Sequence, residues 1–541
     1  MRAIFAGWLM VAATGALAQA APRVASSSGA PLPADQAAMR THVAFLSSDA
    51  MQGREASSPE YMVAARYVAT QFEAAGLAPA GTGNSYLQTV PLVAYRPQGT
   101  GDIVLRRRGA GPRRLIFGKD YVPGAPPGGP TTNVDAPVVF VGRGIVAPSY
   151  QRDDYAGVDV RGKIVAYFDG VPNTFQSEER AHFANPATKA TVAADRGAIG
   201  VIVLRAYPLD DAIPLYDLPI TTWANPDGTG HAAGAPLIAT LGPGGAAKLF
   251  AGARQHWDDI GKAAGIDTAV FRAEQLPGSL AAALHTTFAP SSSANVAGLL
   301  RGSDPALGQE VVVLSAHLDH LGTGAADARG DTIYNGAEDN AVGIAALIEE
   351  ARRFQRSGKP PRRSILFLAV TAEEKGLVGS DYFTHHATLP IGNIVADVNL
   401  DMPIITYRFE DVTVFGADRS TLGPIVSNAV KAFGVTVSPD PDPAQGLFVR
   451  SDHYRFVQQG IPSVFLWPGQ AGAGKAAWVD FFAHRYHQPS DEIGPALDWA
   501  QGVRFVAINY AIAREIADKD ARPKWNKGDF FGLLYRGYGA Q

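Results

Sequence analysis

Residues 310–320, EVVVLSAHLDH, largely decide how the fold is predicted from this sequence. The stretch opens with a short apolar run of the kind that forms a buried strand, and it turns polar at His317. Residues 364–374, SILFLAVTAEE, repeat the pattern, and residues 341–354 between them carry apolar side chains at helical spacing. Buried strands that alternate with helices predict an α/β fold, with a mixed, mostly parallel sheet covered by helices on both faces.

Polar residues stand directly after these predicted strands. His317 and Asp319 follow the first strand, Glu373 and Glu374 follow the second, and Asp401 follows a third at residues 394–400. In open α/β sheets, ligands bind beyond the carboxyl ends of the strands. The residues after the strands are therefore the first candidates for chemistry.

Two turn-rich breaks divide the chain. They are PGAPPGGP at residues 123–130 and APSSS at residues 289–293. Short apolar strands between them are typical of a small, strand-rich module. We therefore expect residues 131–290 to be inserted into one larger domain. The expected parts are a leader at 1–20, the larger domain at 35–130 and 291–522, the module at 131–290, and a tail at 523–541.

The composition excludes several classes of protein. The 541 residues carry 47 Lys and Arg against 51 Asp and Glu, so the formal net charge is −4. This near balance lacks the positive field that nucleic-acid binding needs, and we expect no nucleic-acid partner. The chain has no Cys, which excludes disulfides and thiolate ligands. Any metal must then be held by imidazole and carboxylate groups.

The first 20 residues are typical of a secretory signal peptide. Arg2 precedes an uncharged run over residues 3–17, and two overlapping small-x-small cleavage sites end at Ala18 and Ala20. The run is short for a membrane span, and no other segment holds 18 uninterrupted apolar residues. We expect a periplasmic or secreted protein with no membrane span in the mature chain.

The carboxylates at the strand ends predict a metal site. Several carboxylates buried in one crevice repel one another unless a cation offsets their charge. Zn²⁺ suits a set of nitrogen and oxygen donors, and two Zn²⁺ ions about 3.5–4 Å apart can share one bridging carboxylate.

Five short motifs stand in order along the second half of the chain: His317-x-Asp319, Gly336-Ala337-Glu338-Asp339-Asn340, Glu373-Glu374-x-Gly376-Leu377-x-Gly379-Ser380, Asn399-x-Asp401-Met402 and Tyr486-His487. In this the chain closely resembles the M28 family of co-catalytic zinc aminopeptidases, and in particular bacterial secreted members with a protease-associated (PA) domain. The segment LSSDAMQGR at residues 46–54 also resembles those members, and the module around residues 162–165 and 197–202 resembles a PA domain. The resemblance implies a zinc exopeptidase fold, phosphorylase/hydrolase-like, with an inserted PA-like domain.

The resemblance further implies two zinc ions per chain. His317 and Asp401 would hold one ion, Glu374 and His487 would hold the other, and Asp339 would bridge both.

The resemblance also implies catalytic roles. Asp319 would hydrogen-bond to the imidazole of His317 and fix its tautomer. Glu373 would be the general base that takes a proton from the metal-bridging water and returns it to the leaving amine. Tyr486 resembles a Tyr that donates to the oxyanion in some family members. Residues 450–453 resemble a segment near the site, with substrate or supporting contacts.

These features predict a secreted two-zinc aminopeptidase that hydrolyses N-terminal residues from peptides. The same metal site would also serve a carboxypeptidase, a dipeptidase or an aminoacyl cyclotransferase, and the sequence assigns no carboxylate-binding Arg that decides between them. A non-catalytic binding protein on the same fold is a further alternative. Selectivity depends on loops such as residues 441–449, whose shape the sequence does not reveal.

Overall fold

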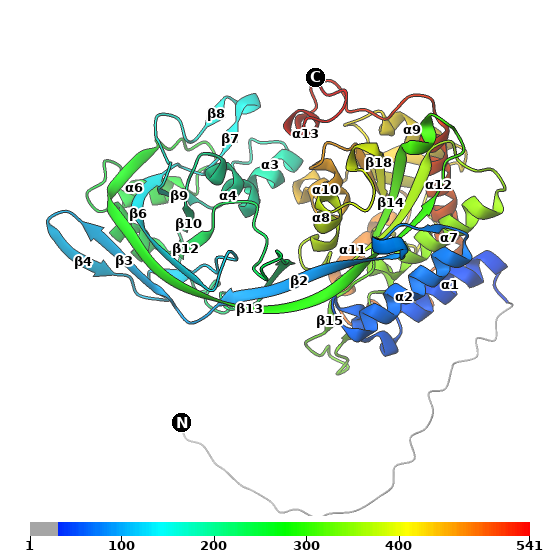
Figure 1. Ribbon diagram of the computed structural model, residues 1–541, viewed down its shortest axis with the longest axis horizontal. Helices are drawn as coiled ribbons and strands as arrows, with labels where there is room; N and C mark the ends of the chain where they lie inside the picture. The colour runs from blue at the N-terminus through cyan, green and yellow to red at the C-terminus, as the bar shows by residue number, and fades with distance from the viewer. Residues whose placement is uncertain (1–30) are drawn as a thin grey trace, which may run out of the picture.

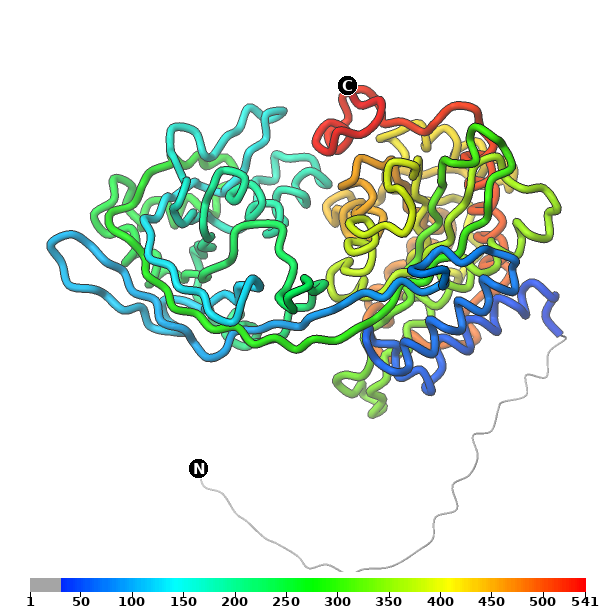
Figure 2. The backbone as a smooth tube through the Cα atoms, in the orientation of Figure 1, coloured from blue at the N-terminus to red at the C-terminus, as the bar shows by residue number. Residues whose placement is uncertain are grey.

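The computed structural model describes residues 31–541, so the predicted signal peptide lies outside the described residues. Two units are joined by a long two-stranded ribbon (Figure 1). The ribbon consists of β2 (Leu87–Pro97) and β13 (Glu274–Leu300), which pair antiparallel. The chain leaves the larger unit along β2, builds the smaller unit, and returns along β13 (Figure 2).

The larger unit is built on a mixed sheet whose central strands are parallel. The strand order is β13–β17–β14–β18–β21–β19–β20, and β17, β14, β18 and β21 run parallel. The predicted α/β fold is thereby confirmed. The bounds of these strands are β14 (Val311–His317), β17 (Ser364–Val370), β18 (Ile394–Asn399), β19 (Asp411–Phe415), β20 (Thr436–Ser438) and β21 (Ser463–Pro468).

Helices pack on both faces of this sheet. One face shares a single core with α1 (Ala34–Leu46), α2 (Pro59–Ala74), α7 (Val342–Arg356), α9 (Leu422–Lys431), α11 (Gly474–His484) and α12 (Trp499–Asp518). The other face is covered by α8 (Val378–His385) and α10 (His453–Val457). Within residues 31–541, no helix combines the length and the apolar character needed to cross a membrane.

Helix α2 forms where the sequence predicts it, because its start is capped. The Ser58 hydroxyl accepts a hydrogen bond from the Tyr61 N–H at 3.0 Å, and Pro59 occupies the first helical position. Tyr61, Val68 and Phe72 lie on one face and are fully buried against the sheet.

The smaller unit has its own sheet, in the order β4–β3–β13–β6–β9–β10–β12–β5. Its strands are β3 (Asp102–Arg107), β4 (Ala110–Arg114), β5 (Tyr121–Pro123), β6 (Thr131–Phe140), β9 (Ile164–Phe168), β10 (Gly200–Leu204) and β12 (Leu237–Leu241). Its helices are α3 (Ser177–Ala184), α4 (Pro186–Asp195), α5 (Pro243–Phe250) and α6 (Trp257–Ala263). A short strand, β11 (Ile220–Trp223), extends back to pair with β2.

The strand pairing differs from the expected boundaries at two places. Strands β3, β4 and β5 belong to the smaller sheet, although we assigned residues up to 130 to the larger domain. Residues 289–293, which we interpreted as a break, lie inside β13 and pair with β2. Pro290 is tolerated there because β13 pairs only with β2 over this stretch. No second strand needs the backbone N–H that Pro lacks.

Candidate metal centre

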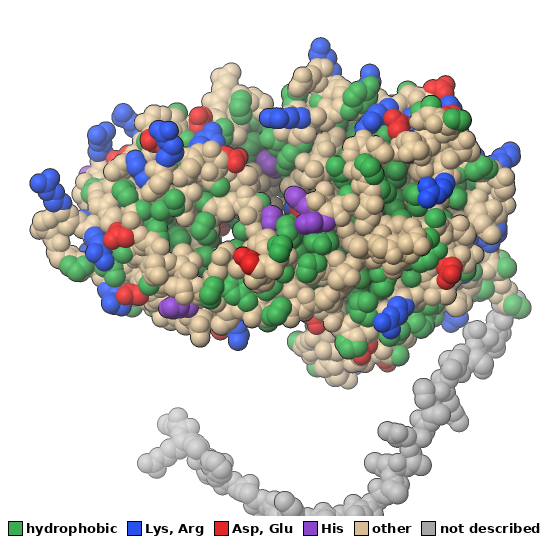
Figure 3. All heavy atoms as spheres, in the orientation of Figure 1, with side chains coloured by type: hydrophobic (Ala, Val, Ile, Leu, Met, Phe, Trp, Pro, Cys, Tyr) green, Lys and Arg blue, Asp and Glu red, His purple; other side chains and the backbone are tan. Residues whose placement is uncertain are grey.

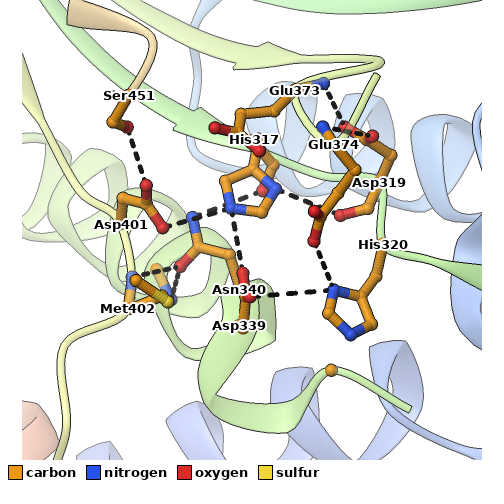
Figure 4. Close-up of polar contacts among 12 residues, drawn as sticks. His317, Asp319, His320, Asp339, Asn340, Glu373, Glu374, Asp401, Met402 and Ser451 are labelled. Atoms are coloured by element: carbon orange, nitrogen blue, oxygen red, sulfur yellow. Dashed lines mark hydrogen bonds and ion pairs between the residues drawn. The ribbon is translucent and has the colours of Figure 1, made fainter. Parts of the chain in front are cut away.

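Four of the predicted metal ligands, His317, Asp339, Glu374 and Asp401, converge beyond the carboxyl ends of the parallel strands (Figure 4). His317 is the last residue of β14, Asp401 follows the end of β18, and Glu374 follows the end of β17. Asp339 lies just before α7, and His487 lies in the turn after α11. All five side chains therefore meet at one edge of the sheet.

The five side chains form two groups that share Asp339. In the first, the His317 Nε2 lies 3.1 Å from an Asp401 oxygen and 3.2 Å from Asp339 Oδ1. In the second, the His487 Nε2 lies 3.3 Å from Glu374 Oε2 and 3.4 Å from Asp339 Oδ2. Asp339 thus turns one oxygen toward each group, which is the arrangement expected of a bridging carboxylate.

His320 also points into the second group, and our ligand assignment omitted it. Its Nδ1 lies 2.8 Å from Glu374 Oε1 and 4.0 Å from Asp339 Oδ2. The ring is fully buried, yet neither of its nitrogens nor Glu374 Oε1 forms a hydrogen bond within residues 31–541. Buried nitrogen and oxygen atoms that lie close together without forming a hydrogen bond are typical of side chains directed at a common cation. The signal in the sequence that could have identified His320 as a ligand candidate is its place as the second His of HLDH, at residues 317–320.

The electrostatics of the centre favour cations. Burial alone would lower the pKa of His317, but the charge of Asp401 and hydrogen bonds with Asp339 and Asp401 raise it well above its ordinary value. Burial likewise opposes protonation of His487, and hydrogen bonds to Asp339 and Glu374 raise its pKa to about 10. The carboxylates therefore create a negative potential that holds positive charge at both groups.

The donors present fit two zinc ions. His317, Asp339 and Asp401 offer ligand atoms that all lie within 4.8 Å of one another, and His320, Asp339 and Glu374 do the same. Both sets consist of nitrogen and oxygen atoms, which Zn²⁺ accepts in tetrahedral sites.

Asp319 contacts the centre through both its backbone and its side chain. The His317 Nδ1 lies 3.1 Å from the backbone carbonyl of Asp319, so the carbonyl and not the carboxylate fixes the ring. The carboxylate instead accepts the backbone N–H groups of Glu373, at 3.1 Å, and Glu374, at 3.3 Å. Asp319 therefore orients the turn that carries the predicted base and a predicted ligand.

Other buried residues hold the ligands in place. The carboxylate of Asp491 accepts the backbone N–H of Asp339 at 3.0 Å. The Ser451 hydroxyl donates to Asp401 Oδ2 at 2.7 Å, which agrees with the supporting role expected of residues 450–453. The Asn340 side chain donates to the Leu400 carbonyl at 2.9 Å and so joins the Asp339 loop to the strand before Asp401. Their signal in the sequence was weak, because each lies far along the chain from its partner.

Arg54, from the N-terminal segment, is buried beneath the centre. Its guanidinium donates to the carbonyls of Leu318 at 3.1 Å, Asn335 at 2.5 Å and Gly336 at 3.0 Å. These carbonyls belong to the two loops that carry His317 and Asp339. Burial lowers the pKa of Arg54 to about 10, while Asp491 and Asp339 oppose the shift, so the group stays charged at neutral pH. Arg54 thus links both ligand-bearing loops and offsets part of their negative charge.

A cavity of about 390 Å³ opens beside the centre. His317, Asp339, Glu373, Asp401 and His487 form one side of it. The space-filling view shows the surface hollowed between the two units (Figure 3).

Tyr486 lies in the wall of this cavity, and its ring stacks on that of His487 with centroids 3.8 Å apart. Three aromatic side chains also line the cavity, Trp467, Trp478 and Phe482, and the Trp467 ring N–H donates to the backbone carbonyl of Asp401 at 2.7 Å. The lining therefore combines polar, cation-binding groups with an apolar, aromatic part.

These features define an α/β protein with a candidate two-metal centre. Residues 295–513 match the model of Peptidase family M28.

Curated relatives match part of the chain. The leupeptin-inactivating enzyme 1 of Streptomyces exfoliatus is 29% identical over 225 residues, which is 39% of this chain and 46% of that protein. The probable leucine aminopeptidase 2 of Aspergillus oryzae is 26% identical over 251 residues, which is 43% of this chain and 46% of that protein. The chain thus spans less than half the length of these relatives. Among solved structures, an aminopeptidase from Aneurinibacillus sp. strain AM-1 is 19% identical with a TM-score of 0.46, over 90% of this chain and 95% of that one.

Replacing Arg54 with Met is expected to weaken zinc binding by about 10–100-fold, as loss of an outer-shell contact typically does. The reason is that the two loops lose their common hydrogen-bond donor. Competition with a chelator of known affinity measures the effect, and Arg66→Met, an exposed position on α2, is the matched control. A folded Arg54→Met protein with wild-type zinc affinity would show that Arg54 does not position the ligands.

Proposed function

We propose that this chain is a two-zinc aminopeptidase that removes N-terminal residues from peptides. The observation that carries the proposal is a half-buried carboxyl, Glu373, in the wall of the same cavity that the predicted ligands line. Neither a purely structural metal site nor a binding protein needs a proton acceptor at that position. In the proposal, His317 and Asp401 would hold one zinc ion, Glu374 and His487 would hold the other with His320 beside them, and Asp339 would contribute to both sites.

Glu373 is the group that would move the proton. Burial raises its pKa well above the ordinary value; His317 opposes the shift, and Glu374 and Asp452 add to it. Zinc ions beside this carboxyl would favour its ionised form, so that it could take a proton from the attacking water and return it to the leaving amine. Zinc, when bound, would polarise the scissile carbonyl and lower the pKa of the water.

We assign Tyr486 to the developing oxyanion. The assignment is supported by its position in the cavity wall, directly before the predicted ligand His487. Burial raises the pKa of its hydroxyl, so the group remains a hydrogen-bond donor at neutral pH.

The charges of the cavity favour a substrate with a free amine. Beyond the predicted ligands, its walls carry the carboxylates of Glu373, Asp440 and Asp442. Arg450 is the only Lys or Arg in the cavity lining that the structure describes. This excess of negative charge attracts an ammonium group and repels a terminal carboxylate, which favours an aminopeptidase over a carboxypeptidase or dipeptidase.

The shape of the cavity favours a bulky apolar first residue. Trp467, Trp478 and Phe482 offer aromatic surface in its apolar part, and Met402 and Leu447 add aliphatic surface. Burying a Leu or Phe side chain against such a wall contributes about 1.5–3 kcal/mol to binding. We therefore propose peptides that begin with a large apolar residue as the substrates.

The smaller unit and the N-terminal leader complete the proposal. We infer that the smaller unit is a PA-like module inserted into the catalytic domain, supported by its separate sheet and its connection through the β2–β13 ribbon. We infer export to the periplasm or the exterior from the signal-like residues 1–20.

The Glu373→Gln protein is expected to lose about 10²–10⁴-fold in kcat, because the amide cannot accept the proton. Its zinc content should equal that of the wild type, since Glu373 is not one of the predicted ligands. Steady-state kinetics and elemental analysis measure the two quantities, with Glu410→Gln, an exposed position, as the control. Activity retained in Glu373→Gln would remove Glu373 from the role of base.

A panel of aminoacyl-nitroanilides, with free and acetylated amines, tests the substrate class. We expect hydrolysis of the free Leu and Phe substrates at least tenfold faster than that of the Asp substrate, and loss of activity with a zinc chelator. Cleavage of the acetylated substrates, or activity that a chelator leaves intact, would contradict the aminopeptidase proposal.

A further inference from the structure

Three segments that lie far apart in the sequence meet at Arg419, in the loop after β19. The guanidinium forms an ion pair with Glu178, on helix α3 of the smaller unit, and another with Asp529, 3.1 Å away in the C-terminal tail. The tail carries the short helix α13 (Phe530–Leu534), which lies beside α3 between the two units (Figure 1). Arg419, Glu178 and Asp529 are called the Arg419 cluster below.

The Arg419 cluster is held in a nearly dry environment. The Arg419 side chain is only 9% exposed, and its guanidinium lies over the rings of Phe448, at 5.2 Å, and Phe531, at 4.9 Å. A guanidinium with two carboxylate partners and two aromatic faces keeps one fixed orientation. Because the pairs are shielded from water, removing Arg419 would leave two buried carboxylates uncompensated, whereas removing Glu178 would leave the Arg419–Asp529 pair in place.

Aromatic contacts extend the junction. The His182 ring on α3 lies 2.9 Å from the Tyr454 hydroxyl of the larger unit, and Tyr454 lies 3.2 Å from the Tyr535 hydroxyl of the tail. Phe530 of the tail packs on Phe183 of α3, with ring centroids 5.6 Å apart. The tail is therefore packed against both units.

Helix α3 also supports the loop that forms the outer wall of the substrate cavity. Arg180 donates to the Ala444 carbonyl at 3.3 Å. Gly446 lies so close to α3 that a Cβ there would lie 2.7 Å from the Cβ of Ala181, and its φ of +59° suits Gly. Gln445 and Leu447, on either side of Gly446, line the cavity. The loop is thus enclosed between α3 and the substrate space.

We propose that the smaller unit and the C-terminal tail act in substrate binding, with Arg419 as the positioning residue that fixes α3 behind residues 440–450. In this arrangement α3 determines the shape of the outer wall of the cavity, and the tail holds α3 in place. The proposal rests on the proposed function, since the cavity is taken as the substrate site. It gives both the inserted unit and the tail a role in the reaction without contact to the metal centre.

The proposal predicts a split between KM and kcat. Arg419 contacts none of the predicted metal ligands or Glu373, so loosening the wall should weaken substrate binding and spare the chemical step. For Arg419→Met and for the milder Glu178→Gln, we expect KM for Leu-nitroanilide to rise about tenfold, with kcat within about twofold and zinc content unchanged. The control is Arg161→Met, which removes an exposed ion pair with Asp159 elsewhere on the smaller unit.

Gly446→Ala tests the same wall without removing a charge. Its added Cβ would push the loop and α3 apart, so it should also raise KM. If Arg419 acts through the loop, the effects of Glu178→Gln and Gly446→Ala on KM should be less than additive in the double variant. Full additivity, an unchanged KM in Glu178→Gln, or equal losses of kcat and bound zinc would overturn the proposal.

Hydrogen exchange separates this proposal from the proposed function. In Glu178→Gln, amide exchange over residues 440–450 should be faster than in the wild type, whether or not any nitroanilide is cleaved. Unchanged exchange in this segment would overturn the positioning role even in an active aminopeptidase. If the wild type cleaves none of the nitroanilides while exchange over residues 440–450 is faster in the variant, the proposed function is wrong. The coupling of α3 to the loop is then still supported.

Discussion

The main constraint on the structure is the mutual repulsion of the carboxylates that are buried together in the candidate metal centre. Asp339 has a carboxylate oxygen within 4.8 Å of one on Asp401 and also of one on Glu374, alongside His317 and His487, at the edge of the central sheet. Burying several negative charges is costly unless positive charge accompanies them. The pKa values of His317 and His487 are raised for the same reason, because a proton on either imidazole offsets part of the negative charge. Two zinc ions would satisfy this constraint more completely than protons do.

Residues that hold these carboxylates come from the whole length of the chain. Arg54 reaches the ligand loops from the N-terminal segment, which lies outside the stretch that matches the M28 family. Asp491, near the end of the matched stretch, accepts the backbone N–H of Asp339, and the Ser451 hydroxyl donates to Asp401. The parallel strands supply the ligands, and these distant contacts fix the positions of the ligands.

The sequence predicts the central sheet and the meeting of the ligands well, because both follow from local patterns. Apolar runs that end in His317 or Glu373 place polar groups at the carboxyl ends of parallel strands, and topology then brings them together. The sequence does not tell which group of Asp319 holds the His317 imidazole, and in the structure it is the backbone carbonyl. Pro290 was misleading because Pro signals a break, whereas a strand with one partner accommodates it. Arg54 and Arg419 act through contacts across hundreds of residues, which no local pattern encodes.

The central claim is that the buried carboxylates hold two zinc ions with Asp339 between them. The most direct test is a crystal structure of the zinc-loaded protein with anomalous data at the zinc edge. The account predicts two peaks, one about 2.0–2.2 Å from His317 and Asp401 and the other at the same distance from Glu374 and His487, with one Asp339 oxygen on each. A single peak, or two peaks of which only one contacts Asp339, would contradict it.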